Sequence, residues 1–330
     1  MGETKKNSKA TSILKNNPLT SIVKGNIGII VVLIIMCVAV ALATDKFLTT
    51  NNIISVLRQI SINTYIALGM TLIIILGHID LSVGSIVAMS GTLTVGFIVN
   101  QGLPLGVAIA AGLLVGTAAG FVSGFIVANF KVPAFIITMA MMNIASGIAY
   151  VYTGGQSTRI TNKLFIEIGT GYLFNVIPLP VVYMVVLIIL FSFILSKTKF
   201  GTYVYAIGGN REAARLSGVP IKKIEIIVFT ISGLLSAFAG LVLCSRMYSG
   251  QPSVGSGYEL DAIAACVVGG VSFTGGIGKI SGVVTGVLIF TSLTYSLTIL
   301  GIDTNLQFIF EGIIILAAVT LDCLKYVQKK

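Results

Sequence analysis

The sequence predicts an all-α, polytopic membrane protein with about ten transmembrane helices, and three observations support this fold class. Hydrophobic residues make up 55% of the 330 residues, charged residues make up only 10%, and the mean hydropathy is +1.01. Soluble domains, by contrast, carry roughly a quarter charged residues. The apolar residues gather in long blocks, and all seven prolines lie before or at the start of a block, where the missing amide proton costs little.

The apolar blocks predict where each span lies, because a helix needs about twenty apolar residues to cross a bilayer. We expect spans at 26–43, 59–76, 83–99, 104–128, 133–152, 178–195, 224–244, 258–271, 281–300 and 307–324. The eighth block is too short to cross as one straight helix. Together the blocks predict a single transmembrane domain, 26–324, between a basic amino-terminal tail, 1–25, and a short carboxy-terminal tail, 325–330.

The lysines and arginines predict that both tails lie in the cytoplasm. With ten alternating spans, most of the 21 basic residues fall on the side of Met1, as the positive-inside rule expects. Anionic lipid headgroups facing these loops explain the net charge of +10, so the membrane is the expected partner and nucleic acid is not. The basic residues that fall on the opposite side are Lys46, Arg58, Arg159, Lys163 and Arg246.

The amino terminus imitates a secretory signal, with Ala41-Leu42-Ala43 in the position of a cleavage site. Its apolar run is longer than the usual ~7 to 15 residues and further spans follow, so we expect an uncleaved first span. The four cysteines lack any paired spacing, so we expect neither disulfides nor a metal site. They are Cys37, Cys244, Cys266 and Cys323.

Two glycine stripes predict an internal repeat. Small residues four positions apart lie on one helix face and let two backbones approach closely in lipid. The stripes occur in the fourth and ninth spans, which correspond if spans two to five repeat as seven to ten. An offset of five spans reverses the orientation of the second copy, and inverted repeats are typical of transporters with a path near the midplane. The glycines are 112, 116, 120 and 124 in the first stripe and 278, 282 and 286 in the second.

Polar residues interrupt the apolar pattern beside the second and eighth spans. "GHIDLSVG" supplies His78, Asp80 and Ser82, and "YELD" supplies Glu259 and Asp261. Irregular backbone of this kind survives in a membrane where it is buried in protein or lines a cavity. Asp80 either contacts solute or holds the chain reversal, and we favour the second role. For His78 we favour a helix-end polar group over a solute ligand or proton relay.

The longest loop on the cytoplasmic side, 197–223, predicts a short helix. Asn210 is a favoured N-cap residue, and Gly218 followed by Pro220 supplies a stop, so we expect a helix at 211–217. It is either a solvated loop helix or a contact for another protein chain. As a contact, it should turn Ala213 and Ala214 toward its partner.

The chain itself contains no nucleotide site that the sequence can identify. "GGIGKISG", residues 275–282, resembles a phosphate loop, but Phe273, two residues before it, stands where the first glycine is required. Ile280 stands where a serine or threonine must follow the lysine. A dinucleotide fingerprint that starts at Gly276 also fails, because its third glycine falls on Ser281. We therefore expect no catalytic site and no cofactor here. Any ATPase would be a separate chain that binds ATP and Mg²⁺.

Three stretches carry a resemblance to a known family. "GHIDLSVGSIVAMSG", "NREAARLSGV" and "ELDAIAACVVGGVSFTGGIGKISGVVTG" are similar to the signature stretches of permease subunits of bacterial ABC importers for simple sugars, and the similarity runs over residues 52–321. His78 departs from the small residue expected before "IDLSVG". The resemblance implies alternating access in the bacterial inner membrane, a second permease copy or close paralogue, ATPase subunits and an extracytoplasmic sugar-binding protein. It also implies that the ATPase docks on Asn210, Arg211, Glu212, Ala213, Ala214, Arg215 and Gly218.

The sequence does not determine which solute is transported. A related permease for a nucleoside, a signalling furanose or a branched-chain amino acid would keep the docking helix and change the path. An ion-coupled secondary transporter would use Asp80, His78 or Glu311 as its ion site and would not need that helix. For a neutral sugar, the residues that could match its hydroxyls are Asn63, Thr64, Asn143 and Gln156.

Overall fold

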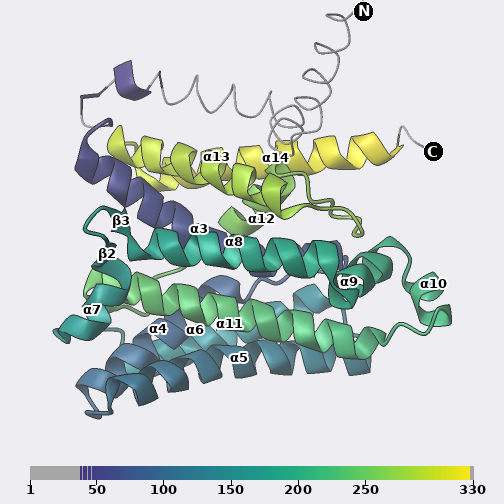
Figure 1. The fold of residues 1–330 in the computed structure, drawn as a ribbon, viewed down its shortest axis with the longest axis horizontal. Coiled ribbons are helices and arrows are strands. Elements are labelled where there is room, and N and C mark those ends of the chain that lie inside the picture. The colour runs from purple at the N-terminus through teal and green to yellow at the C-terminus, as the bar shows by residue number, and fades with distance from the viewer. Residues whose placement is uncertain (1–37, 39, 43, 46, 328–330) are drawn as a thin grey trace, which may run out of the picture.

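The structure is a computed structural model that describes residues 38, 40–42, 44–45 and 47–327 (Figure 1). The predicted amino-terminal tail, almost all of the first predicted span and residues 328–330 lie outside the described residues. Within the described part, helices dominate, which confirms the all-α class.

Each predicted block from the second onward overlaps one helix, and the largest difference is at the second block, where the helix begins at Thr50 and not at residue 59. The corresponding helices are α3 (Thr50–Ile75), α4 (Val83–Val99), α5 (Leu105–Phe130), α6 (Ala134–Thr153), α8 (Leu179–Lys197), α11 (Ile221–Met247), α12 (Tyr258–Val268), α13 (Ile280–Ile299) and α14 (Thr304–Val327). Six of them, α3, α5, α6, α8, α11 and α13, are long and apolar enough to cross a membrane. Helix α12 is short, as predicted, and the total of ten spans stays a prediction.

The sequence did not predict several elements outside the apolar blocks. Helix α7 (Lys163–Thr170) and the antiparallel pair β2 (Tyr172–Leu173) and β3 (Ile177–Pro178) lie before α8. Strand β1 (Thr158–Arg159) pairs with β4 (Ser249–Gly250). The loop after α8 folds into α9 (Lys199–Gly209) and α10 (Arg211–Leu216). Figure 1 shows α7 at one end of the bundle and α10 at the other.

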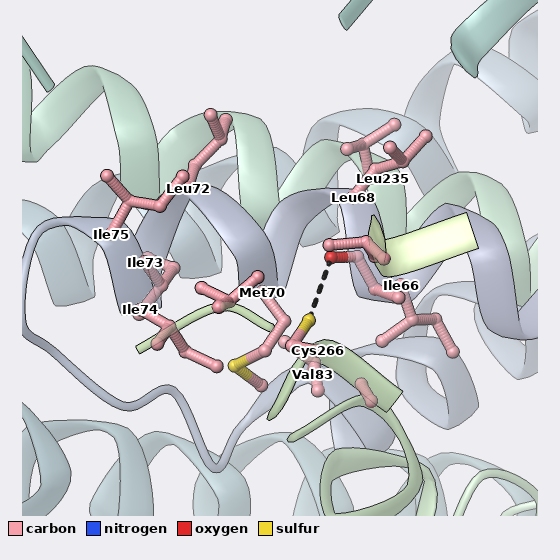
Figure 2. Packing of buried hydrophobic residues seen from close by; sticks show 14 of the residues in the cluster. Ile66, Leu68, Met70, Leu72, Ile73, Ile74, Ile75, Val83, Leu235 and Cys266 are labelled. Carbon is pink, nitrogen blue, oxygen red and sulfur yellow. Dashed lines mark hydrogen bonds between the residues drawn. The ribbon is translucent and has the colours of Figure 1, made fainter. Parts of the chain in front are cut away.

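Helices α3 and α11 form the centre of the bundle. Every residue of α3 from Ile60 to Ile75 is buried, because other helices surround it. Figure 2 shows part of this core, which includes Leu68, Met70 and Leu72 of α3, Leu235 of α11 and Cys266 of α12. The Cys266 thiol lies 3.4 Å from the Ala67 carbonyl oxygen, at hydrogen-bond distance for sulfur. A helix that is apolar on all sides is expected at such a position.

The glycine stripe of α5 is a close-packing surface, as predicted. A Cβ atom at Gly120 would lie 3.0 Å from the Cα atom of Gly233 in α11, and one at Gly124 would lie 3.0 Å from the Cα atom of Ile226. In the second stripe, a Cβ at Gly286 would collide with the Ala265 carbonyl oxygen of α12. Both stripes therefore bring backbones into direct contact.

Candidate solute path and docking helix

The amino-terminal ends of α4 and α12 meet inside the bundle. A Cβ atom at Gly84, in the first turn of α4, would collide with the Glu259 carboxylate and the Gly255 carbonyl oxygen. The Glu259 carboxylate accepts a 3.3 Å hydrogen bond from the Gly257 amide at the start of α12. The partial positive charge of a helix amino terminus favours a hydrogen-bond acceptor at this place.

From this junction the two short helices lead to opposite ends of the bundle. Helix α4 runs past β4, where a Cβ atom at Gly250 would lie 3.1 Å from the Cα atom of Thr92. Helix α12 runs the other way, and the Gly276 amide beyond it donates a 2.8 Å hydrogen bond to the Ile75 carbonyl at the end of α3. The glycine at position 84 is what allows the two ends to approach.

Asp80 lies in the loop between α3 and α4 and is 1% exposed. Its Oδ1 accepts hydrogen bonds from the Ser82 amide at 2.9 Å and the Ser82 hydroxyl at 2.6 Å. Its Oδ2 accepts a 3.2 Å hydrogen bond from the Ser232 hydroxyl of α11. An aspartate that binds the amide two residues ahead stabilises a turn, so this geometry supports the expected role of Asp80 in the chain reversal.

His78 lies in the same loop, and its partner is a carboxylate that the sequence analysis overlooked. His78 Nε2 lies 3.1 Å from Oε1 of Glu225, whose side chain is fully buried in α11. Arg211 of α10 donates to both oxygens of this carboxylate, through Nη1 to Oε1 and through Nη2 to Oε2, the latter at 3.2 Å. These hydrogen bonds raise the pKa of the Arg211 guanidinium. His78, Glu225 and Arg211 thus connect the α3–α4 loop, α11 and α10.

Helix α10 is capped at both ends by the residues on which its prediction was based. Asn210 Oδ1 accepts a 2.9 Å hydrogen bond from the Ala213 amide. At the other end, Gly218 has φ +79°, its amide donates to the Arg215 carbonyl, and the Val219 amide donates to the Ala214 carbonyl. This paired arrangement is the Schellman cap. The helix ends at Leu216, one residue earlier than predicted.

The faces of α10 differ from the prediction at one position. Ala213 is exposed, but Ala214 is buried in the main hydrophobic core, so it does not face outward as expected. The apolar side chain on the free face is instead Leu216, which is 81% exposed. Arg211 is turned toward Glu225, whereas Arg215 pairs with Glu212 within the helix. Ala214 is buried because α10 packs onto neighbouring elements. The sequence of a six-residue helix does not show which of its faces is packed in this way.

A chain of uncharged polar groups and one arginine joins α3 to three other helices. Asn63 is 5% exposed and donates a 2.9 Å hydrogen bond to the Thr291 hydroxyl of α13. Gln59 donates to Asn63 Oδ1 at 3.3 Å and to the Tyr258 hydroxyl of α12 at 3.2 Å. Arg246 of α11 donates a 3.0 Å hydrogen bond to Gln59 Oε1. We call these five residues the polar chain.

The other residues considered for solute lie elsewhere. Asn143 is exposed on α6 and, with Gly147 and Tyr152, lines a surface depression of that helix. Gln156 is exposed beyond the end of α6, and Thr64 donates to the Ile60 carbonyl of its own helix. The structure therefore places Asn63, but not these three, in the polar chain.

The carboxylates of the second signature stretch, Glu259 and Asp261, both lie in the first turn of α12. Helix α14, which carries Glu311, packs against α12. Asp80 and Ser82 lie across the α4–α12 junction from this group, since Gly84 of α4 meets Glu259. The structure thus brings the two predicted signature stretches together at one place.

Comparison with known proteins identifies the family. Residues 52–319 match the family described as the permease component of branched-chain amino acid transport systems. The chain belongs to this family. It is 44% identical to the ribose import permease protein RbsC of Haemophilus influenzae over 296 residues, which cover 88% of this chain and 91% of the relative. It is 42% identical to the L-arabinose transport system permease protein AraH of Escherichia coli over 302 residues, which cover 92% and 91% of the two chains.

A second ribose permease is similar to the same degree as AraH. The ribose import permease protein RbsC of Bacillus subtilis is 42% identical over 292 residues, which cover 88% of this chain and 90% of the relative. No solved structure matches the chain significantly. The family membership agrees with the resemblance carried by the three sequence stretches.

Proposed function

We propose that the chain is the membrane permease subunit of an ATP-driven importer that moves a monosaccharide into the bacterial cytoplasm by alternating access. It performs no covalent chemistry. A separate ATPase binds ATP and Mg²⁺, an extracytoplasmic binding protein delivers the sugar, and two permease copies assemble in the plasma membrane. Relatives 42% and 44% identical bear the names of ribose and arabinose permeases, which supports a simple sugar over the other solutes.

The polar chain carries this proposal. Sugars are neutral and present hydroxyl groups that both donate and accept hydrogen bonds. Gln59, Asn63, Tyr258 and Thr291 offer amides and hydroxyls of both kinds, contributed by α3, α12 and α13. Polar groups inside a membrane protein are rare and mark solute pathways. We therefore place the sugar next to this chain, beside the junction of α4 and α12.

The packing of the helices supports ten spans built as an inverted repeat. If α3 to α6 correspond to α11 to α14, each contact has a counterpart. Helix α5 packs on α11 and α13 packs on α3, while α4 packs on α11 and α12 packs on α3. The two central helices, α3 and α11, and the two short helices that meet at Gly84 also correspond. In this arrangement both termini and α10 face the cytoplasm.

Helix α10 is the proposed ATPase contact. Its caps fix a short rigid helix, and Ala213 and Leu216 lie exposed on it. Movement of the ATPase subunits against α10 would open the permease path outward, and ATP hydrolysis would reset it.

The proposal can be tested by reconstituting the permease in proteoliposomes together with its partner ATPase and binding protein. We expect ATP-dependent uptake of ribose or arabinose, and replacing Asn63 by leucine should lower uptake about tenfold, as the loss of one or two hydrogen bonds predicts. Thr64→Val is the matched control, because the Thr64 hydroxyl bonds only its own helix. ATP-dependent uptake of leucine and not of sugar would favour a branched-chain amino acid. Uptake driven by a proton or sodium gradient without ATP would replace the proposal with a secondary transporter.

A further inference from the structure

Glu225 occupies an unusual position for an acidic residue. It lies in the first turns of α11, a helix long and apolar enough to span a membrane, and its side chain is fully buried. A buried carboxylate is stable only when cations or hydrogen-bond donors surround it. Here the donors come from two other parts of the chain, Arg211 of α10 and His78 of the α3–α4 loop.

The two partners share one oxygen of Glu225. Both His78 Nε2 and Arg211 Nη1 contact Oε1, and only Arg211 also reaches Oε2. The Arg211 side chain is 47% exposed, so it lies at the protein surface, whereas the His78 ring is largely covered and packs 6.1 Å from the Phe229 ring. Arg211 of α10 and His78 of the α3–α4 loop are therefore joined through the same carboxylate.

The α3–α4 loop is attached to α11 at a second place. Ser232 lies about two helical turns beyond Glu225 on α11 and binds Asp80, two residues after His78. The loop therefore runs along α11 and is held by Glu225 at one point and by Ser232 at the other. Beyond it, α4 begins and meets α12 at Gly84.

From these contacts we propose that Glu225 is a positioning residue, which ties α10 to the α3–α4 loop through Arg211 and His78 and so transmits movement of the docking helix to the α4–α12 junction. The inference rests on the proposed function, because it requires that the ATPase moves α10. It adds a specific route between the docking helix and the solute path, and it gives His78 a role that its sequence context did not reveal.

The test compares Glu225→Gln and Arg211→Gln in the complete transporter, with Lys222→Gln as the control. Lys222 is an exposed cation in the first turn of α11 that contacts Asn129 and not Glu225. We expect Glu225→Gln to keep the ATPase bound, because Glu225 is buried in α11 and lies outside the docking helix. Both variants should lower sugar import per ATP hydrolysed by about tenfold, because removing one partner disrupts a buried ion pair. The control should keep the wild-type ratio.

Two further variants separate coupling from simple stabilisation. The double variant should be no worse than either single variant, since residues of one network are not additive. Arg211→Lys, which keeps the charge, should recover part of the import ratio. If thermal unfolding in detergent shows that Glu225→Gln is unstable, the test rests on sugar import per ATP hydrolysed by Arg211→Gln. The Arg211 side chain is half exposed, so its replacement disturbs the core less.

The remaining outcomes overturn the inference in distinguishable ways. If both Gln variants import as much sugar per ATP hydrolysed as the wild type, Glu225 does not transmit movement from α10. The importer proposal would be unaffected by this result. Loss of the ATPase from a stable Glu225→Gln variant would show that Glu225 supports the docking contact itself. Import by the wild-type chain without any ATPase would contradict both the ATP-driven importer proposal and the proposed role of Glu225.

Discussion

The hydroxyl of Ser232 in α11 donates a 3.2 Å hydrogen bond to Oδ2 of Asp80, and Ser82 donates to the other carboxylate oxygen. Both oxygens of Asp80 are therefore engaged by the protein. The Ser82 bonds close a turn inside the loop, and the Ser232 bond attaches that turn to α11. The arrangement favours a structural role for Asp80 at the start of α4.

Substitutions of Asp80 should separate the structural role of its hydrogen bonds from any role of its negative charge in transport. Asp80→Asn keeps an acceptor for Ser82 and a hydrogen-bonding group for Ser232, so the purified complex should stay assembled and retain much of its uptake. Asp80→Leu leaves the buried donors unsatisfied, and each should cost about 1 to 3 kcal/mol of stability. Thermal unfolding in detergent and uptake in vesicles measure the two effects.

Ser232→Ala is the matched control for Asp80, because it removes one of the three donors and leaves the turn with Ser82 intact. It should cost less than Asp80→Leu. If Asp80→Asn abolishes uptake in a complex that is fully assembled and stable, the carboxylate charge takes part in transport and the structural role is wrong.

The close contact of α4 with α12 predicts that Gly84 tolerates no side chain. A Cβ atom there would collide with the Gly255 carbonyl oxygen, which is backbone and cannot turn away, so Gly84→Ala should cost about 1 to 3 kcal/mol. Gly106→Ala in α5 is the control, since a Cβ atom there meets nothing within 4 Å, and it should change stability by no more than about 0.5 kcal/mol. Equal unfolding temperatures for the two variants would contradict this junction.

The proposed orientation predicts opposite accessibility for two lysines. Lys163 begins α7 and Lys199 begins α9, and α8, with 19 residues, separates these elements. In a cysteine-free background, an impermeant thiol reagent applied to whole cells should label Lys163→Cys, and it should label Lys199→Cys only after the membrane is opened. The reverse pattern would place the termini and α10 outside.

The sequence was sufficient to locate the long apolar helices, because each apolar block is separated from the next by glycine, proline or polar residues. Helices α7 and α9 lie outside these blocks and were missed. The sequence was insufficient to orient the apolar helices. Lipid and protein core are both apolar, so a residue such as Asn143 gives no sign of whether its face is buried, and the structure places it on the exposed side of α6. The same reasoning explains why Asn63, in an equally apolar helix, could not be distinguished from Asn143.

Local capping signals predicted α10 almost completely, since Asn210 and Gly218 act on residues next to them. The network around Glu225 could not be predicted, because its partners lie on other elements and only the folded chain brings them together. A signal for Glu225 was nevertheless present in the sequence. It is an acidic residue inside the seventh apolar block, where an ionisable group needs a partner.

Helix α10 allows a test that separates docking from folding, since its two adjacent alanines lie in different environments. Ala213 is exposed, so Ala213→Trp should change the stability of the isolated permease by no more than about 0.5 kcal/mol, yet it should block the ATPase contact. Ala214 is 4% exposed, so Ala214→Trp overpacks the core and should cost about 1 to 3 kcal/mol in the permease alone. Gly218→Pro should disrupt the cap, because proline cannot adopt φ +79° and lacks the amide that bonds Arg215.

Co-purification of the ATPase with each variant, together with sugar uptake in vesicles, measures the result. Thr202→Trp is the control, since Thr202 is exposed on α9 in the same loop and lies outside α10. Ala213→Trp should release the ATPase or uncouple hydrolysis from uptake, while Thr202→Trp keeps both functions and Ala214→Trp lowers the unfolding temperature of the permease itself. Normal ATPase association and normal uptake in both Ala213→Trp and Gly218→Pro would show that α10 is a solvated loop helix. The secondary-transporter alternative would then become the leading explanation of the path.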